Sequence, residues 1–170
     1  MIFTEFRGKV ITWAKERRII PNSSLEAQNL KLAEEFGELA DGLRKGNMEK
    51  IKDSVGDVAV VVTIMAGLMG AEIDNLPDTQ SSYYANKENL QYSFMWLQAD
   101  IGEIAKYIIR DKNENLFYSL ANVISDLQAF CKWQGIEFMD CCELAWDEIK
   151  DRKGYLNEQG IFIKEEDYAN

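Results

Sequence analysis

Three glutamates with the spacing E-E-x-x-E are the side chains best suited to chemistry in this sequence: Glu34, Glu35 and Glu38. In a helix with 3.6 residues per turn, Glu35 and Glu38 lie about one turn apart, so their carboxylates can share one hard cation. Glu35 also lies at the edge of an apolar stripe that contains Leu32 and Leu39. A solvated acidic helix face has the same spacing, so the triplet indicates a metal site only if further ligands converge on it.

Asp57 is a candidate ligand because its neighbours on the same side of a helix are apolar. Val58, Val60, Val61 and Ile64 follow it at the spacings that place side chains near its own. A carboxylate in these surroundings needs a partner, since burying an unpaired charge is strongly unfavourable. No Lys or Arg follows within one helical turn, so the partner must come from elsewhere.

The turn at Gly46 brings these carboxylates together in the expected fold. It joins two expected helices into an antiparallel hairpin, and by the helical rise Glu38 and Asp57 both lie about 12–15 Å from the turn. Asp53 and Ser54, one turn before Asp57, add further oxygen atoms. A ligand set made only of oxygen suits Mg²⁺ or Mn²⁺ better than zinc or copper.

Composition narrows the possible chemistry further. The 170 residues include no His, which excludes His-based triads, imidazole general bases and His-liganded zinc or haem. The net charge of −10 argues against a nucleic-acid polymer as partner, although a nucleotide can bind through a divalent metal. The Cys spacing indicates reduced thiols, and no uncharged run is long enough for a membrane span. We therefore expect a cytoplasmic protein without a membrane segment.

Apolar residues recur at helical spacing along most of the chain, and only 2 Pro are present. This pattern predicts an all-α fold, a helical bundle built from two related helical hairpins plus N- and C-terminal helices. Pro77 and its polar neighbours predict a linker at 70–85, and an extended stretch is expected at 160–163. The helices are expected at 3–18, 24–45, 48–69, 87–110, 116–134 and 138–153.

The two expected hairpins resemble each other at an offset of 65 residues, with 8 identities between residues 31–70 and residues 96–135. Two unrelated helical hairpins can reach the same identity, so duplication is one of two interpretations. The positions equivalent to the candidate ligands are occupied by Asp100, Glu103, Ser119 and Asn122. With only two carboxylates, this second half is expected to hold a metal poorly.

The segments KLAEEFGELADGLRKG and IKDSVGDVAVVV resemble the MazG-type all-α nucleoside-triphosphate pyrophosphohydrolases, which include relatives of the dimeric dUTPases. That family is marked by E-E-x-x-E followed by E-x-x-D, and its carboxylates bind magnesium. The resemblance implies that Glu35, Glu38 and Asp57 hold Mg²⁺ (or Mn²⁺).

This sequence departs from the family pattern at Ser54, which stands where the family has the Glu of E-x-x-D. Asp53 is the alternative ligand, although it is rotated by about 100° on the helix. The segments 145–154 and 160–167 resemble the C-terminal helix and tail of short, often phage-encoded members. We therefore interpret residues 1–170 as one MazG-like domain. Its parts are a first half with the metal site at 1–76, an inserted, degenerate hairpin at 86–135, and a C-terminal helix and tail at 136–170.

The resemblance also implies hydrolysis of an NTP or dNTP between its α and β phosphates, which yields a monophosphate and pyrophosphate. Glu34 would orient or deprotonate the attacking water. Active family members are dimers or larger, so we expect a homodimer or an internal pseudo-dimer. The alternative is a catalytically weak or inactive nucleotide-binding or regulatory protein of the same fold. The candidate substrate contacts, four cations for phosphates and one aromatic ring for a base, are Lys31, Lys52, Arg152, Lys153 and Trp13.

Overall fold

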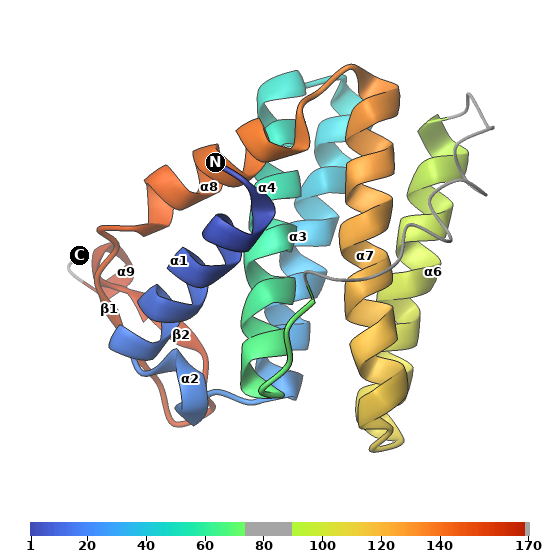
Figure 1. The fold of residues 1–170 in the computed structure, drawn as a ribbon. Helices are drawn as coiled ribbons and strands as arrows, with labels where there is room; N and C mark the ends of the chain where they lie inside the picture. Colours follow the sequence, from blue (N-terminus) through green and yellow to red (C-terminus); the bar gives the residue numbers. More distant parts are fainter. Residues whose placement is uncertain (74–89, 169–170) are drawn as a thin grey trace.

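The computed structural model describes residues 1–73 and 90–168, and within them the chain forms an all-α bundle with one small antiparallel sheet (Figure 1). The predicted fold class is thus confirmed. None of the described helices is long and apolar enough to cross a lipid bilayer. The elements are α1 (Phe3–Glu16), α2 (Ile19–Asn22), α3 (Leu25–Lys45), α4 (Met48–Leu68), α6 (Leu90–Ile109), α7 (Asn113–Gln134), α8 (Phe138–Ile149), β1 (Gly154–Leu156), β2 (Phe162–Lys164) and α9 (Glu165–Tyr168).

The first hairpin, α3 and α4, has clear start and stop signals. The Ser24 hydroxyl accepts a hydrogen bond from the backbone N–H of Ala27 and so caps the start of α3. Gly46 ends α3 in the left-handed conformation, with φ of 65°, which glycine adopts without strain. The Asn47 side chain then accepts from the N–H of Lys50 and caps α4. These local signals explain why the two helices were predictable from the sequence.

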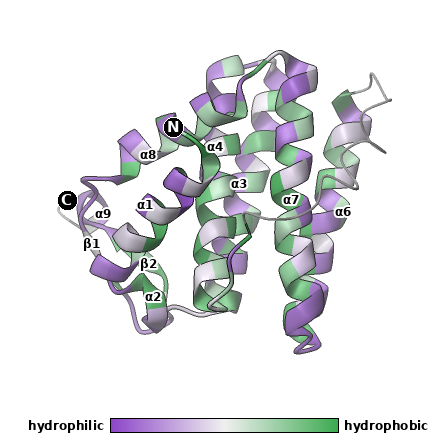
Figure 2. Cartoon of the chain, in the orientation of Figure 1, coloured by the Kyte–Doolittle hydropathy of each residue, from purple (hydrophilic) through white to green (hydrophobic). Residues whose placement is uncertain are grey.

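Helix α4 is the centre of the bundle and packs against α1, α3, α7 and α8. Most of its residues are buried, and Figure 2 shows apolar residues concentrated along it. Gly56 allows α8 to approach closely, because a Cβ there would collide with the Cys141 carbonyl and the Ala145 side chain. This close contact fixes α8 against the part of α4 that carries Asp53 and Asp57.

The second hairpin, α6 and α7, lies beside the first (Figure 1), with α6 against α3 and α7 against α4. The rings of Phe36 and Phe94 stack between α3 and α6, with centroids 4.6 Å apart. Most of the predicted linker at 70–85, and the predicted start of the fourth helix at residue 87, lie outside the described residues.

The two ends of the chain differ from the sequence prediction. Helix α1 ends at Glu16 and not at residue 18, because Arg18 has a left-handed backbone with φ of 58°. Helix α8 ends at Ile149 and not at residue 153, since the chain turns into β1 at Gly154. The expected extended stretch is present as β2, and its antiparallel partner β1 and the short α9 were not predicted.

Contacts between distant parts of the sequence hold these ends together. The Arg17 guanidinium donates to the backbone carbonyls of Arg152 and Lys150 at 2.7 and 3.0 Å. The Ser23 hydroxyl donates to the carbonyl of Gly160 at 2.7 Å. The β1–β2 hairpin therefore lies against α1, α2 and the start of α3, where it closes one side of a cavity.

Candidate metal centre and adjoining cavity

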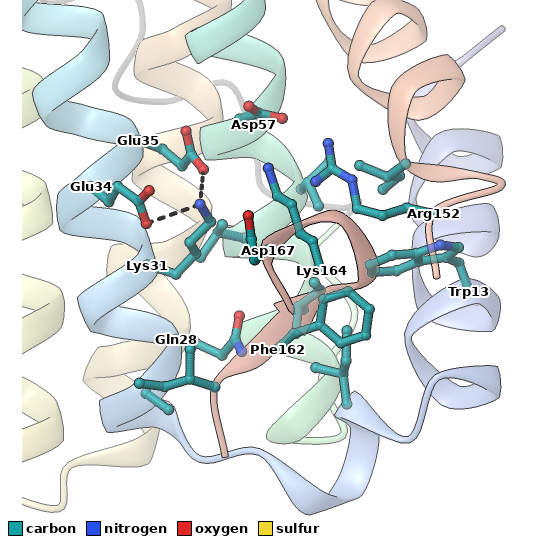
Figure 3. Close-up of a pocket in the computed structure, with 17 residues that line it drawn as sticks. Trp13, Gln28, Lys31, Glu34, Glu35, Asp57, Arg152, Phe162, Lys164 and Asp167 are labelled. Atoms are coloured by element: carbon teal, nitrogen blue, oxygen red, sulfur yellow. Dashed lines mark hydrogen bonds and ion pairs between the residues drawn. The ribbon is translucent and has the colours of Figure 1, made fainter. Parts of the chain in front are cut away.

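A cavity of about 300 Å³ lies between the α3–α4 hairpin and the C-terminal hairpin (Figure 3). This volume is at the lower end of the range for small-molecule sites. Charged side chains and an apolar, aromatic region both face it. Its lining is formed by Trp13, Ile19, Ala27, Gln28, Lys31, Glu34, Glu35, Asp57, Val60, Val61, Ile64, Ile149, Arg152, Ile161, Phe162, Lys164 and Asp167.

Asp57, which lines this cavity, belongs to a cluster of carboxylates from two helices whose other members, Asp53 and Glu148, lie outside the lining. Asp53 and Asp57 on α4 and Glu148 on α8 each place an oxygen within 4.8 Å of the other two. Glu35 on α3 is buried, with 6% of its surface exposed, and its charge acts on both aspartates. Three helices thus contribute acidic groups to one small volume.

The cluster carries an excess of negative charge, which affects the pKa values of its aspartates. Burial, followed by the charges of Glu35, Asp53 and Glu148, raises the pKa of Asp57 to about 8, against a smaller opposing effect of Arg152. Burial and the neighbouring acids also raise the pKa of Asp53. Near neutral pH, Asp57 therefore keeps a proton, which a cation bound at the cluster would displace.

The outer carboxylates of the site are held by cations of the chain itself. Lys31 Nζ lies 2.6 Å from Glu35 Oε1 and 3.0 Å from Glu34 Oε2, as Figure 3 shows. Arg152 Nη2 lies 2.6 Å from Glu148 Oε1. These side chains can move to an anionic ligand only if something else compensates the carboxylates that they leave.

The residues present fit a hard divalent cation. Asp53, Asp57 and Glu148 supply a compact set of oxygen ligands, and Glu35 lies close enough for its charge to raise the pKa of Asp57. Burial and then the charges of the neighbouring acids raise the pKa of Asp57, and a cation bound beside it would offset both effects.

The other end of the cavity is apolar and aromatic. Phe162 on β2 meets Trp13 on α1 edge to face, with ring centroids 5.9 Å apart. The Arg17 guanidinium lies 4.9 Å from the centroid of the Trp13 ring. Trp13 is thus held between an aromatic ring and a cation, and Phe162 is the second aromatic side chain that faces the cavity.

Some of the residues predicted from the sequence line the cavity, and others do not. Glu38 lies outside the lining, 3.7 Å from Lys50 Nζ, although its charge still acts on Asp53. Ser54 is 1% exposed, and its hydroxyl has no hydrogen-bond partner among the described residues. The candidates that line the cavity are Trp13, Lys31, Glu34, Glu35, Asp57 and Arg152.

Two of the expected phosphate contacts do not line this cavity. Lys52 is adjacent on the helix to Asp53, but its charge acts on the thiol of Cys141 on α8. Lys153 lines neighbouring surface hollows, since α8 ends before it and the backbone changes direction. Both residues therefore lie outside the lining of this cavity.

Sequence reasoning missed the contributions of α8 and the C-terminal hairpin. Glu148 was detectable only through its spacing, because Glu148 and Arg152 form an i,i+4 pair in a segment predicted to be helical. Phe162 and Lys164 belong to a stretch predicted to be extended, and only the fold shows that they reach the cavity. Gln28 was visible only as a polar residue on the apolar side of α3.

The second half has a different arrangement of acids. Asp126 on α7 is buried and shares a hydrogen bond with the Asp100 carboxyl, which together with burial raises the pKa of Asp126 to about 8. Glu103 is paired with Lys106 at 2.7 Å. Asp126 Oδ2 is buried and has no hydrogen-bond partner among the described residues. This pair of acids therefore differs from the three-helix cluster of the first half.

Comparison with known proteins finds similarity over only part of the chain. A stretch of 54 residues, 32% of this chain, is 46% identical to an uncharacterized 18.2 kDa protein from the rep-hol intergenic region of Haemophilus phage HP1. The similarity covers 33% of that phage protein's length. No family model matches the chain, and no solved structure is significantly similar to it.

Proposed function

We propose that this chain is a metal-dependent nucleoside-triphosphate pyrophosphohydrolase that converts an NTP or dNTP to the monophosphate and pyrophosphate. The observation that carries this proposal is a cavity lined by cations, by an aromatic region and by Asp57, which joins it to the carboxylate cluster with Asp53 and Glu148. A metal–nucleotide complex matches this arrangement: its cation and phosphates suit the charged end of the cavity, and its base suits the aromatic end. The resemblance to MazG-type enzymes supports the same reaction.

In this proposal Asp53, Asp57, Glu148 and Glu35 would hold Mg²⁺ (or Mn²⁺). Glu38 would add negative charge nearby, since its charge acts on Asp53. The metal supplies charge neutralisation on the phosphates and on the leaving pyrophosphate. It also allows a protein with a net charge of −10 to bind a polyanion.

The remaining steps belong to side chains of the cavity. Lys31 and Arg152 exchange their present partners for phosphate oxygens, and with Lys164, which also lines the cavity, they orient the triphosphate. Glu34, which shares Lys31 with Glu35, takes a proton from the attacking water. The water oxygen bonds to the α-phosphorus, the bond from that phosphorus to the bridging oxygen breaks, and pyrophosphate departs.

The test is a pyrophosphate-release assay over the eight common NTPs and dNTPs, with Mg²⁺, with Mn²⁺ and with EDTA. We expect metal-dependent release with at least one nucleotide and none from Asp57→Asn. Asp126→Asn is the matched control, because Asp126 has the same raised pKa but lies in the other hairpin. Equal activity of wild type and Asp57→Asn would refute this assignment of the site.

The second candidate is a nucleotide-binding or regulatory protein of the same fold that has lost turnover. Two observations favour it: Ser54 in place of a carboxylate, and the occupation of Glu35 and Glu148 by Lys31 and Arg152. Metal-dependent nucleotide binding without pyrophosphate release would select this candidate.

The packing of the two hairpins against each other also supports an internal pseudo-dimer, in which α6 and α7 take the place of a second subunit. We propose that the chain acts in the cytoplasm, where nucleotides and Mg²⁺ are available. Size-exclusion chromatography with light scattering tests the pseudo-dimer, which predicts a monomer of 19.5 kDa. A dimer would favour the homodimer of the family.

A further inference from the structure

One buried polar side chain at the apolar end of the cavity has no role in the mechanism above. Gln28 on α3 is 6% exposed and faces the cavity beside Phe162 (Figure 3). The same lining contains the apolar side chains of Ala27 and Ile161 and, one helical turn along α3, Lys31. Its carboxamide carries a donor group, Nε2, and an acceptor, Oε1, and either is unfavourable to bury without a hydrogen-bond partner.

The orientation of this carboxamide is fixed by a relay of hydrogen bonds. The Ser23 hydroxyl has one proton, and it donates this proton to the Gly160 carbonyl at 2.7 Å. The hydroxyl oxygen must then accept from Gln28, so the Nε2 group faces Ser23, at 2.9 Å. Reversing the amide would place two acceptors against each other.

The far end of the relay is itself rigid. Asn157 Oδ1 accepts from the N–H groups of Gln159 and Ile161, and the Gly160 N–H donates to the Asn157 carbonyl at 3.0 Å. Gly160 has φ of 75°, and a Cβ there would lie 3.3 Å from the Cα of Ser23. The loop between β1 and β2 therefore holds in place the Gly160 carbonyl, which accepts the hydrogen bond from Ser23.

The result is a hydrogen-bond acceptor of fixed direction. No donor among residues 1–73 and 90–168 is bonded to Gln28 Oε1, which is left for a ligand. Uracil, thymine and guanine carry a ring N–H and an adjacent carbonyl where cytosine and adenine carry a ring lone pair and an adjacent amino group. The fixed carboxamide presents Oε1 as an acceptor beside the second Nε2–H as a donor, and this order matches the ring N–H and the carbonyl of a keto base. The reversed order matches the ring lone pair and the amino group of an amino base, so a freely rotating carboxamide pairs with both.

We propose that Gln28, oriented by Ser23 and Gly160, makes the cavity discriminate between keto bases (uracil, thymine, guanine) and amino bases (cytosine, adenine). Phe162 and the Trp13 edge hold the base in the plane that this contact requires. The inference rests on the proposed function, because it takes the ligand of the cavity to be a nucleoside triphosphate. Gln28 is in this proposal a specificity-determining residue and takes no part in the phosphate chemistry.

The experiment compares dUTP with dCTP and GTP with ATP, since each pair differs mainly in the keto or amino pattern. We expect the wild-type kcat/KM to differ at least tenfold within a pair. Ser23→Ala frees the carboxamide to reverse, so the preference should fall at least tenfold while the favoured nucleotide keeps at least a tenth of its kcat. Gln28→Met, which removes the acceptor at similar size, should also lose the preference.

Ser24→Ala is the matched control, because Ser24 caps α3 one residue away and does not belong to the relay. It should lower the melting temperature and leave the preference unchanged. A relay that only supports the structure would lower kcat/KM for all four nucleotides equally in Ser23→Ala, and this result would overturn the inference.

Equilibrium binding of the same nucleotides with Ca²⁺ in place of Mg²⁺ separates the two proposals. One outcome is a base preference in binding that Ser23→Ala removes, with no hydrolysis of any nucleotide in the Mg²⁺ assay. This outcome would refute the enzyme and retain the role of Gln28. Hydrolysis of the four nucleotides with ratios that neither variant changes would retain the enzyme and refute the role of Gln28. An absence of both binding and hydrolysis would refute both.

Discussion

Replacing Asp57 by Asn should stabilise the metal-free protein while removing its response to metal. Burial and neighbouring acids raise the pKa of Asp57 from 3.8 to about 8. At pH 7 the folded protein therefore retains a proton that the unfolded chain has released, and this difference opposes folding. Asn has nearly the shape of the protonated Asp and carries no such penalty.

The size of the effect follows from the two pKa values. Each pKa unit corresponds to about 1.4 kcal/mol, and pH 7 is about three units above the pKa of the unfolded carboxyl, which sets a ceiling of about 4 kcal/mol. Because the cavity is open to solvent, we expect a gain of about 2 to 4 kcal/mol in the free energy of unfolding. A metal at a hundredfold excess over its Kd should stabilise wild type by about 2.7 kcal/mol and Asp57→Asn by much less.

Urea unfolding at pH 7, in EDTA and in Mg²⁺ or Mn²⁺, measures both quantities. Asp126→Asn is again the control: it should be stabilised in EDTA for the same reason but should respond to metal as wild type does. If Asp57→Asn is less stable than wild type in EDTA, the charge argument is wrong. If it responds fully to metal, the cluster that contains Asp57 is not the metal site.

Three further outcomes follow from other groups. Glu148→Gln should weaken Mn²⁺ binding about tenfold or more by calorimetry, because it removes a ligand charge, and an unchanged affinity would exclude Glu148 from the site. Lys31→Met should tighten binding of Mn²⁺ alone, because it frees the Glu35 carboxylate, and should weaken pyrophosphate binding; an increase in both affinities would contradict the exchange of partners. Stability should fall as pH rises from about 4 to about 8, because the raised pKa of Asp126 keeps a proton in the folded state only. Melting curves of Asp126→Asn over this range should show a smaller fall.

The helices were predictable because their signals are local. Apolar periodicity and the turn at Gly46 identified α3 and α4, and the expected bounds lie within one residue of the observed ones. The same periodicity placed Asp57 on a buried helix, so its need for partners was visible in advance. Local signals of this kind require no knowledge of what lies opposite in the fold.

The rest of the site could not be predicted because it depends on the path of the chain after α8. The chain leaves the helix after Ile149, so helical spacing does not give the positions of Arg152 and Lys153. Glu148 joins the cluster only because Gly56 lets α8 approach α4, which is a packing effect between distant residues. Phe162 and Lys164 depend in turn on the pairing of β1 with β2.

The contact between Ser23 and Gly160 also bears on the order in which this protein loses structure. Each helical hairpin is closed by a turn of a few residues, whereas the β1–β2 hairpin is held by partners more than a hundred residues away, such as Arg17 and Ser23. Units of this kind open with their own free energies, so β1–β2 can detach while α3 and α4 stay folded. A nucleotide bound in the cavity would then act as a clamp. It would slow hydrogen exchange in 154–164 more than in α4 and would protect the C-terminal segment from proteolysis.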